Sequence, residues 1–245
     1  MSEPTRPRRR DLIHAAGSGA ALFMAGAALF AGCAGREQHE GITPKGQHTA
    51  AVSPDEDLMR EHGLLERILQ VYEASIGRIE GNRELQPEVL ANAAGIVRSF
   101  IEDYHQKLEE DYVFPKVEQI PRFAGLVGTL RAQHAAGRRL TDTILRLAPK
   151  APVASEGSKA ELVDALREYI RMYRPHAARE DTVIFPAFHE LVSAHEYSAL
   201  GKQFEQSEHR TFGKVGFASM VDSVAKLERD VGIHDLALFT PKPTR

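Results

Sequence analysis

The sequence has very little cysteine and no strong excess of charge. Among its 245 residues Cys33 is the only cysteine, so an intramolecular disulfide is impossible. Removing residues 1–32 leaves 27 basic and 32 acidic side chains, a formal net charge of −5. Such a chain has no basic surface of the kind that binds nucleic acid. The alternating pattern of β-strands is also missing, which favours an all-α fold.

What the sequence does contain is a duplicated motif. His-x-x-x-Glu-acid-x-x-aliphatic-Phe-Pro occupies residues 105–115 and recurs at 176–186, 71 positions later. His62 and His134 precede the two copies by 43 and 42 residues. The repeated unit is therefore a histidine, a gap, and then His-x-x-x-Glu.

Helical spacing gives this motif a chemical meaning. Residues i and i+4 share one face of an α-helix, so His105 can lie beside Glu109, and His176 beside Glu180. Apolar residues recur in steps of three and four around His62 and His176, which predicts that these faces are buried. A buried carboxylate must be protonated, paired or bound to a cation, because losing its hydration costs several kcal/mol.

Each residue also has an ordinary alternative role. A lone histidine in an apolar stripe commonly makes a hydrogen bond in the core, and a single His-x-x-x-Glu is commonly a solvated pair on a helix surface. A metal-free bundle would need cationic partners for Glu109 and Glu180. The combination of four histidines and two glutamates at matched offsets favours a metal site instead. These ligands are too many for one tetrahedral zinc and suit two six-coordinate ions.

The two motif copies resemble the signature of the hemerythrin-like, or HHE cation-binding, family, over about residues 54–191. The resemblance implies an antiparallel up-down four-helix bundle around a non-haem di-iron centre, in which an oxo or hydroxo bridge joins two Fe ions. It also implies that two glutamates bridge the irons. By this resemblance the metal ligands are His62, His105, Glu109, His134, His176 and Glu180.

Arg138 departs from the family pattern. Oxygen-carrying hemerythrins have a fifth histidine one turn after the third-helix ligand, and Arg138 stands at that position. A guanidinium stays charged and has no lone pair for a metal, so it cannot replace imidazole. We expect water or Glu208 to fill the position, with Tyr104, Glu110 and His209 as the other candidates. Reversible oxygen carriage is therefore not expected.

The N-terminal segment has the pattern of an export signal. Arg8-Arg9-Arg10 precedes an uncharged stretch, residues 15–32, that is rich in Ala and Gly. This is typical of a twin-arginine signal, and Cys33 then follows small residues as in a lipobox. Residues 1–33 thus predict a lipoprotein anchored by Cys33 at the periplasmic face of the membrane. The alternative is a transmembrane anchor, although about 18 residues of this composition are marginal for a ~30 Å hydrocarbon core.

The rest of the chain divides into three parts. Residues 34–52 are polar and predict a flexible tether, residues 53–191 the bundle, and residues 192–245 a C-terminal helical extension. Ser53, Ser158 and Ser193 are predicted N-caps, and Phe185-Pro186 is the predicted end of the fourth bundle helix. The helices are expected at about 54–79, 87–118, 122–147, 158–185, 194–212 and 217–227.

The first functional hypothesis is a di-iron protein of the cell envelope that binds or reacts with O2, NO or peroxide. This hypothesis includes sensing, scavenging and storage of the small molecule. It applies to an enzyme as well as to a binding protein. The second hypothesis is an iron-binding or iron-responsive interaction protein, in which the metal mainly stabilises the bundle and the extension contacts a partner. The expected partners are a small molecule and, through the lipid anchor, the membrane.

Overall fold

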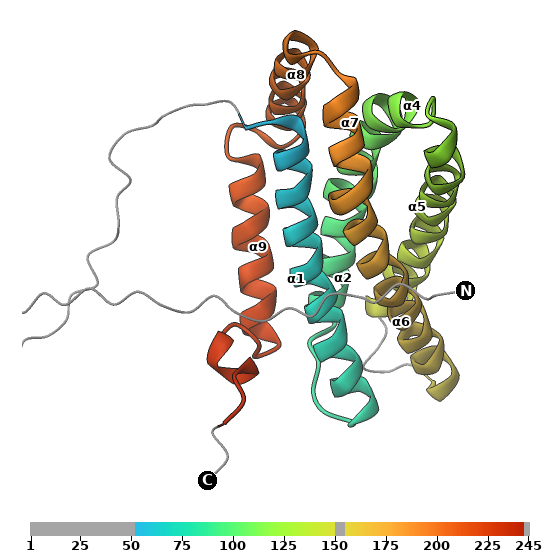
Figure 1. Ribbon diagram of the computed structural model, residues 1–245. Coiled ribbons are helices and arrows are strands. Elements are labelled where there is room, and N and C mark those ends of the chain that lie inside the picture. Colours follow the sequence, from blue (N-terminus) through green and yellow to red (C-terminus); the bar gives the residue numbers. More distant parts are fainter. Residues whose placement is uncertain (1–51, 150–154, 243–245) are drawn as a thin grey trace, which may run out of the picture. The chain divides into compact units, whose positions relative to one another are not determined.

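The computed structural model of the protein describes residues 52–149 and 155–242 (Figure 1). The predicted signal, Cys33 and the predicted tether up to residue 51 lie outside these residues. All regular structure within them is helical, which confirms the predicted all-α class. None of the helices in these two ranges is both long enough and apolar enough to cross a membrane.

The bundle region of the described chain consists of four helical rods. The first and third rods are single helices, whereas the second and fourth contain π-helical segments. The first rod is α1 (Pro54–Glu80) and the third is α5 (Pro121–Leu147). The second comprises α2 (Pro87–Ile96), π-helical Val97–His105, α3 (Gln106–Leu108), π-helical Glu109–Val113 and α4 (Phe114–Val117). The fourth comprises α6 (Glu156–Arg179), π-helical Glu180–Ile184 and α7 (Phe185–Leu191).

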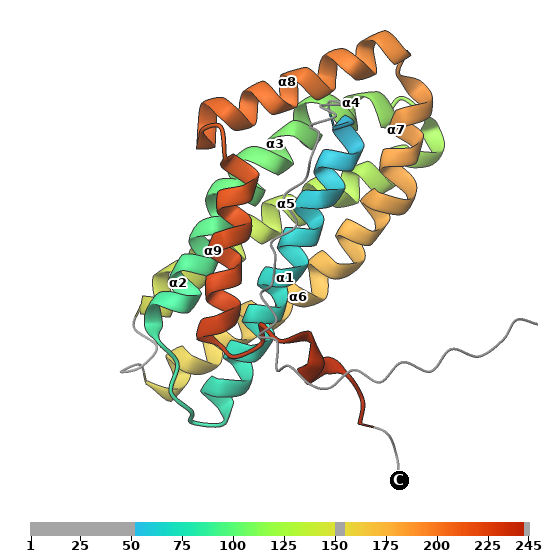
Figure 2. The same cartoon turned by 90° about the vertical axis from the view of Figure 1, so that its left-hand side faces the viewer.

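The rods enclose one hydrophobic core. α1 contacts α6, α6 contacts α5, α5 contacts α2, and α2 contacts α1, so the helices close around a shared interior (Figures 1 and 2). Large aromatic side chains fill part of this interior, among many aliphatic residues, and add to the buried apolar area from which its stability arises. The largest fully buried aromatic residues of the rods are Tyr72, Phe100, Phe114, Tyr169, Tyr173, Phe185 and Phe188.

Capping serines determine where several helices begin. The Ser53 hydroxyl accepts a hydrogen bond from the Glu56 backbone N–H at 3.4 Å, and Ser193 caps α8 in the same way, as predicted. The prediction that Ser158 caps the fourth rod is wrong. Ser155 takes that role by accepting from the Ser158 backbone N–H at 3.3 Å. Because this earlier serine can already cap the helix, Ser158 becomes part of its first turn.

The Phe185-Pro186 pair does not end the fourth rod, contrary to prediction. The chain passes through π-helical Glu180–Ile184 and continues as α7. In an ordinary α-helix the proline ring clashes with the carbonyl one turn earlier, whereas a wider π turn relieves that clash. The second rod likewise has a π segment, Glu109–Val113, just before its own Phe-Pro pair. Both of these wide turns begin at a predicted bridging glutamate.

The C-terminal extension packs onto the rods. α8 (Ala194–Phe212) lies across one end of the bundle, and α9 (Gly216–Asp230) runs beside α1 and α2 (Figure 2). α9 is longer at both ends than the predicted helix, and a short 3-10 helix, Leu236–Phe239, follows it. Two nitrogens of Arg67 donate to the two carboxylate oxygens of Glu228 at 2.7 Å, which ties α1 to α9. The extension is therefore part of the folded unit.

Gly137 provides a test of the packing between α5 and α6. A Cβ atom there would lie 2.8 Å from the Tyr173 ring, which is 1% exposed and whose hydroxyl accepts from Gln106 at 2.7 Å. Because that ring has no room to move, we expect Gly137→Ala to lower the free energy of unfolding by about 1–3 kcal/mol through overpacking. Urea unfolding followed by circular dichroism measures the change.

Gly128 is the matched control on the same helix. A Cβ atom at Gly128 meets nothing within 4 Å. Alanine is the better helix former, so Gly128→Ala should raise the free energy of unfolding by up to about 1 kcal/mol. Equal effects of the two substitutions would contradict the close contact between Gly137 and Tyr173.

Candidate metal centre

The structure brings all six predicted ligand residues together in the core. They come from all four rods: one histidine from α1, one from α5, and a histidine and glutamate from each of the other two rods. None of the six residues is more than 5% exposed. They are His62, His105, Glu109, His134, His176 and Glu180.

The four histidines form two pairs. His62 Nε2 lies 3.0 Å from His105 Nε2, and His134 Nε2 lies 3.1 Å from His176 Nε2. In each pair one histidine comes from an uninterrupted rod and the other from a motif copy. All four Nε2 atoms are therefore directed toward the middle of the bundle.

The two glutamates lie between the histidine pairs. Glu109 Oε1 is 3.4 Å from His105 Nε2, while its Oε2 is 3.4 Å from His134 Nε2. Glu180 Oε2 is 3.0 Å from His176 Nε2 and 3.4 Å from His62 Nε2. Each carboxylate thus contacts one histidine of each pair, as a group bridging two cations would.

This donor set fits two metal cations. Glu109 Oε1 and both carboxylate oxygens of Glu180 are buried without a hydrogen-bond partner. Buried carboxylates require positive charge nearby, and a cation would supply it. His62, His105 and Glu109 can converge on one ion, and the corresponding residues of the other half on a second, since the donor atoms in each group lie within 4.8 Å. Imidazole with carboxylate suits first-row transition metals.

Each histidine is also held from its outer side. The Nδ1 atoms make hydrogen bonds with side chains that lie next to predicted ligands in the sequence. Such bonds fix the ring orientation and leave Nε2 free to bind a metal. The four Nδ1 contacts are His62 to Asp181 at 2.7 Å, His105 to Glu61 at 2.7 Å, His134 to Glu110 at 3.0 Å and His176 to Gln133 at 2.8 Å.

These outer partners follow the same internal repeat as the ligands. Glu61 and Gln133 each precede the first histidine of a repeat, and Glu110 and Asp181 each follow a motif glutamate. From the sequence, Glu110 was a candidate only for the position of the missing histidine, and no role was predicted for Asp181, Glu61 or Gln133. Their adjacency to ligands in both copies was the available signal. The repeat is imperfect, because Glu61 is a carboxylic acid and Gln133 a neutral amide.

The phenylalanines of the motif cover the histidines. The Phe114 ring stacks on His134 with 5.5 Å between centroids, and the Phe185 ring stacks on His62 at 5.6 Å. Each motif therefore supplies a ligand pair and also an apolar cover for a histidine on a different rod. Together with the low exposure of the ligands, these rings keep bulk water away from the centre.

Arg138 acts on an outer partner of the centre. Its guanidinium donates to Glu110 Oε1 at 2.9 Å, and the same oxygen accepts from His134 Nδ1. Burial alone would raise the pKa of Glu110, but the hydrogen bonds from His134 and Arg138 outweigh it and lower that pKa to about 2. Arg138 thus helps His134 to stabilise the ionised form of the carboxylate that orients His134.

The side chains expected to fill the position of the missing histidine lie elsewhere. Glu208 accepts from the Phe217 backbone N–H at 2.6 Å and clusters with Asp57 and Glu61. The Tyr104 hydroxyl donates to a backbone carbonyl of α8, and His209 lines a surface pocket. Glu110 contacts the outer nitrogen of His134, as described above. The Glu208 hypothesis is wrong, because Glu208 groups with Glu61, the hydrogen-bond partner of His105, and not with His134. Water stays the prediction.

Comparison with known proteins agrees with this geometry. The sequence model of the hemerythrin HHE cation binding domain matches residues 53–188. Uncharacterized proteins of Mycobacterium tuberculosis and Mycobacterium bovis are 41% identical over 246 residues, covering 98% of this chain and 94% of theirs. With that coverage the similarity extends into the segment before Ser53. No solved structure matches the chain.

Substitution of the motif histidines tests the ligand assignment. His105→Ala or His176→Ala should strongly reduce the metal content from about two ions per chain, because each removes a buried Nε2 donor. His189→Ala and His195→Ala are the controls, since both histidines are exposed and lie beyond the motifs. Metal analysis of the purified variants gives the comparison, and comparable losses in both groups would refute the assignment.

Proposed function

Because the chain belongs to the hemerythrin HHE cation-binding domain family, we propose that it is a non-haem di-iron protein that binds or reacts with O2, NO or peroxide. The supporting observation is the convergence of four Nε2 atoms and two carboxylates from four rods on one buried place. We assign the rods to the antiparallel up-down four-helix bundle of this family, with residues 53–191 as the domain.

In this proposal each residue has a defined task. His62 and His105 would hold one iron, His134 and His176 the other, and the two bridging glutamates would be shared between them. Bound iron would supply one-electron chemistry and open coordination positions for a small ligand. The Nδ1 partners keep the imidazoles oriented, and the motif phenylalanines exclude water.

The enclosure of the centre supports the choice of ligand class. All six proposed ligands are at most 5% exposed, so a substrate of ordinary size would have to open the bundle. Molecules of two to four atoms such as O2, NO and hydrogen peroxide need no such opening. Sensing, scavenging and storage would all begin with the binding of such a small molecule at the centre.

A second candidate is an iron-responsive interaction protein. The observation that favours it is the exposure of three apolar side chains in the last short helix: Leu236 is 80%, Leu238 64% and Phe239 55% exposed. Apolar residues grouped on a surface commonly mark a contact with another protein. Turnover of peroxide by the loaded protein would favour the first candidate, and its absence would favour this one.

We further propose that the protein is exported to the cell envelope by the twin-arginine route and is anchored through a lipid on Cys33. The support is the sequence pattern of residues 1–33 together with the extension of the mycobacterial similarity into this segment. This route carries folded proteins, so iron could be inserted in the cytoplasm, away from the Cu and Zn that bind such ligands more strongly.

The reaction with O2 tests the proposed chemistry. We expect iron-loaded, reduced protein to oxidise rapidly and irreversibly in stopped-flow mixing with O2, and to consume added peroxide. The physical reason is that Arg138 has no lone pair to donate, so both irons would keep an open position. Metal-free protein is the control. A spectral change that lasts minutes and reverses when O2 is removed would instead indicate oxygen carriage.

Replacing Arg9 and Arg10 by lysine tests the export route. The twin-arginine pair is the feature that the pathway requires, so the double variant should stay in the cytoplasm as folded, metal-loaded protein. Fractionation followed by immunoblotting of the full chain measures its location. Lysine substitution at Arg6, outside the arginine run, is the control. Undiminished export of the double variant would argue against the route.

A further inference from the structure

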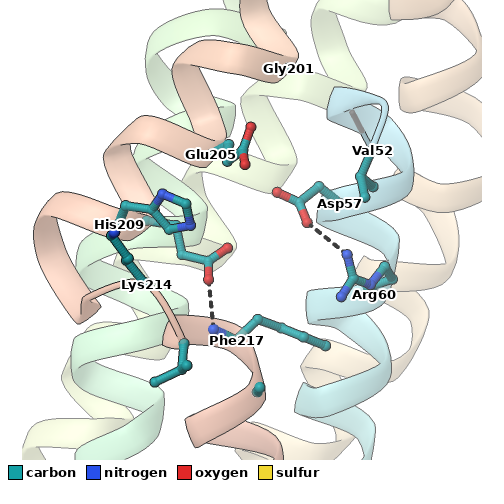
Figure 3. Close-up of a pocket in the computed structure, with 11 residues that line it drawn as sticks. Val52, Asp57, Arg60, Gly201, Glu205, His209, Lys214 and Phe217 are labelled. Carbon is teal, nitrogen blue, oxygen red and sulfur yellow. Dashed lines mark hydrogen bonds and ion pairs between the residues drawn. The ribbon is translucent and has the colours of Figure 1, made fainter. Parts of the chain in front are cut away.

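A pocket of about 380 Å³ opens at the junction of α1, α8 and α9 (Figure 3). Its lining includes the carboxylates of Asp57, Glu205 and Glu208 and the cationic side chains of Arg60 and Lys214. Figure 3 shows Asp57 on α1 facing the helix that carries Glu205. Nothing in the proposed chemistry of the metal centre uses this pocket.

Behind the pocket lies a fully buried carboxylate, that of Glu61. One of its oxygens, Oε2, accepts from His105 Nδ1 at 2.7 Å, whereas Oε1 is buried without a hydrogen-bond partner. One oxygen from each of Asp57, Glu61 and Glu208 lies within 4.8 Å of the other two. A buried acceptor with no donor thus lies in a group of three carboxylates.

Nearby cations compensate this charge only in part. Arg60 approaches Asp57 at 3.4 Å, and its guanidinium carbon also lies over the Phe217 ring, 4.4 Å from the centroid. Carboxylates held this close repel one another, and burial increases the cost of keeping them charged. A divalent cation bound between them would offset both effects. Oxygen-only ligands suit hard ions such as Mg²⁺, Ca²⁺ and Mn²⁺.

Glu208 also has a structural role, but this role explains the position of only one of the three carboxylates. Its Oε1 accepts from the Phe217 N–H near the start of α9, and a Cβ atom on Gly216 would lie 2.6 Å from that oxygen. Because Gly216 has no side chain, there is space for the Glu208 carboxylate beside it. Capping of α9 does not explain why Asp57 and the unpaired oxygen of Glu61 converge on the same place.

We propose that Asp57, Glu61 and Glu208 form a second divalent-cation site, between the surface pocket and the histidine-rich centre. Glu61 links the two sites, with one oxygen on His105 and the other available to the second cation. The site differs from the centre in having oxygen donors only. Its existence does not depend on which small molecule the centre binds.

Manganese binding tests this site. The full-length protein is first loaded with iron, and Mn²⁺ is then titrated while free Mn²⁺ is measured by electron paramagnetic resonance. We expect the wild type to bind about one Mn²⁺ per chain beyond the iron, and Asp57→Asn to bind it roughly tenfold or more weakly. Glu196→Gln, which removes a partly exposed α8 carboxylate paired with Lys116, is the control and should behave as wild type.

Gly216→Ala provides a second variant that keeps all three carboxylates. The added methyl group should displace the Glu208 oxygen and weaken Mn²⁺ binding, while circular dichroism and iron content stay those of the wild type. Equal Mn²⁺ affinity of Asp57→Asn and wild type, or no Mn²⁺ bound by wild type at about 1 mM, would overturn the proposal. A failure of the histidine-rich centre would appear separately, as missing iron before Mn²⁺ is added.

Discussion

The structure depends on the burial of two carboxylates, Glu109 and Glu180, among four imidazoles. A carboxylate without positive charge nearby is unstable in a protein interior, and three oxygens of this pair have no hydrogen-bond donor. The surrounding features all serve the same place: ligands come from four rods, both short π turns begin at these glutamates, and phenylalanines cover the histidines. A metal cation would satisfy the constraint that these residues create.

The internal repeat explains why the centre has two similar halves and where they differ. Ligands, outer partners and covering phenylalanines occur in both halves, but Glu61 in one corresponds to Gln133 in the other. The difference lies on the side where α8 and α9 pack, next to Asp57 and Glu208. Only the Glu61 half therefore has a titratable carboxyl group at the outer nitrogen of its histidine. The C-terminal extension thus packs on the side of the centre where the two halves of the repeat differ.

Residues at a fixed helical spacing could be recognised in the sequence, whereas contacts set by tertiary packing could not. The 71-residue repeat was enough to select the six residues that converge, and the Ser53 and Ser193 caps followed from local motifs. The start of α6 at Ser155 was missed because two serines competed as caps. The outer partner Glu61 was missed since its contact with His105 joins different rods. The continuation past Phe185-Pro186 required a wide turn that residue preferences do not encode.

Metal analysis of anaerobically purified protein, with visible spectra before and after dithionite, tests the central claim most directly. We expect about two irons per chain and a visible absorption that dithionite removes, because the buried donors suit two redox-active transition-metal ions. Folded protein that contains no metal, or a single zinc with no spectral change on reduction, would contradict it.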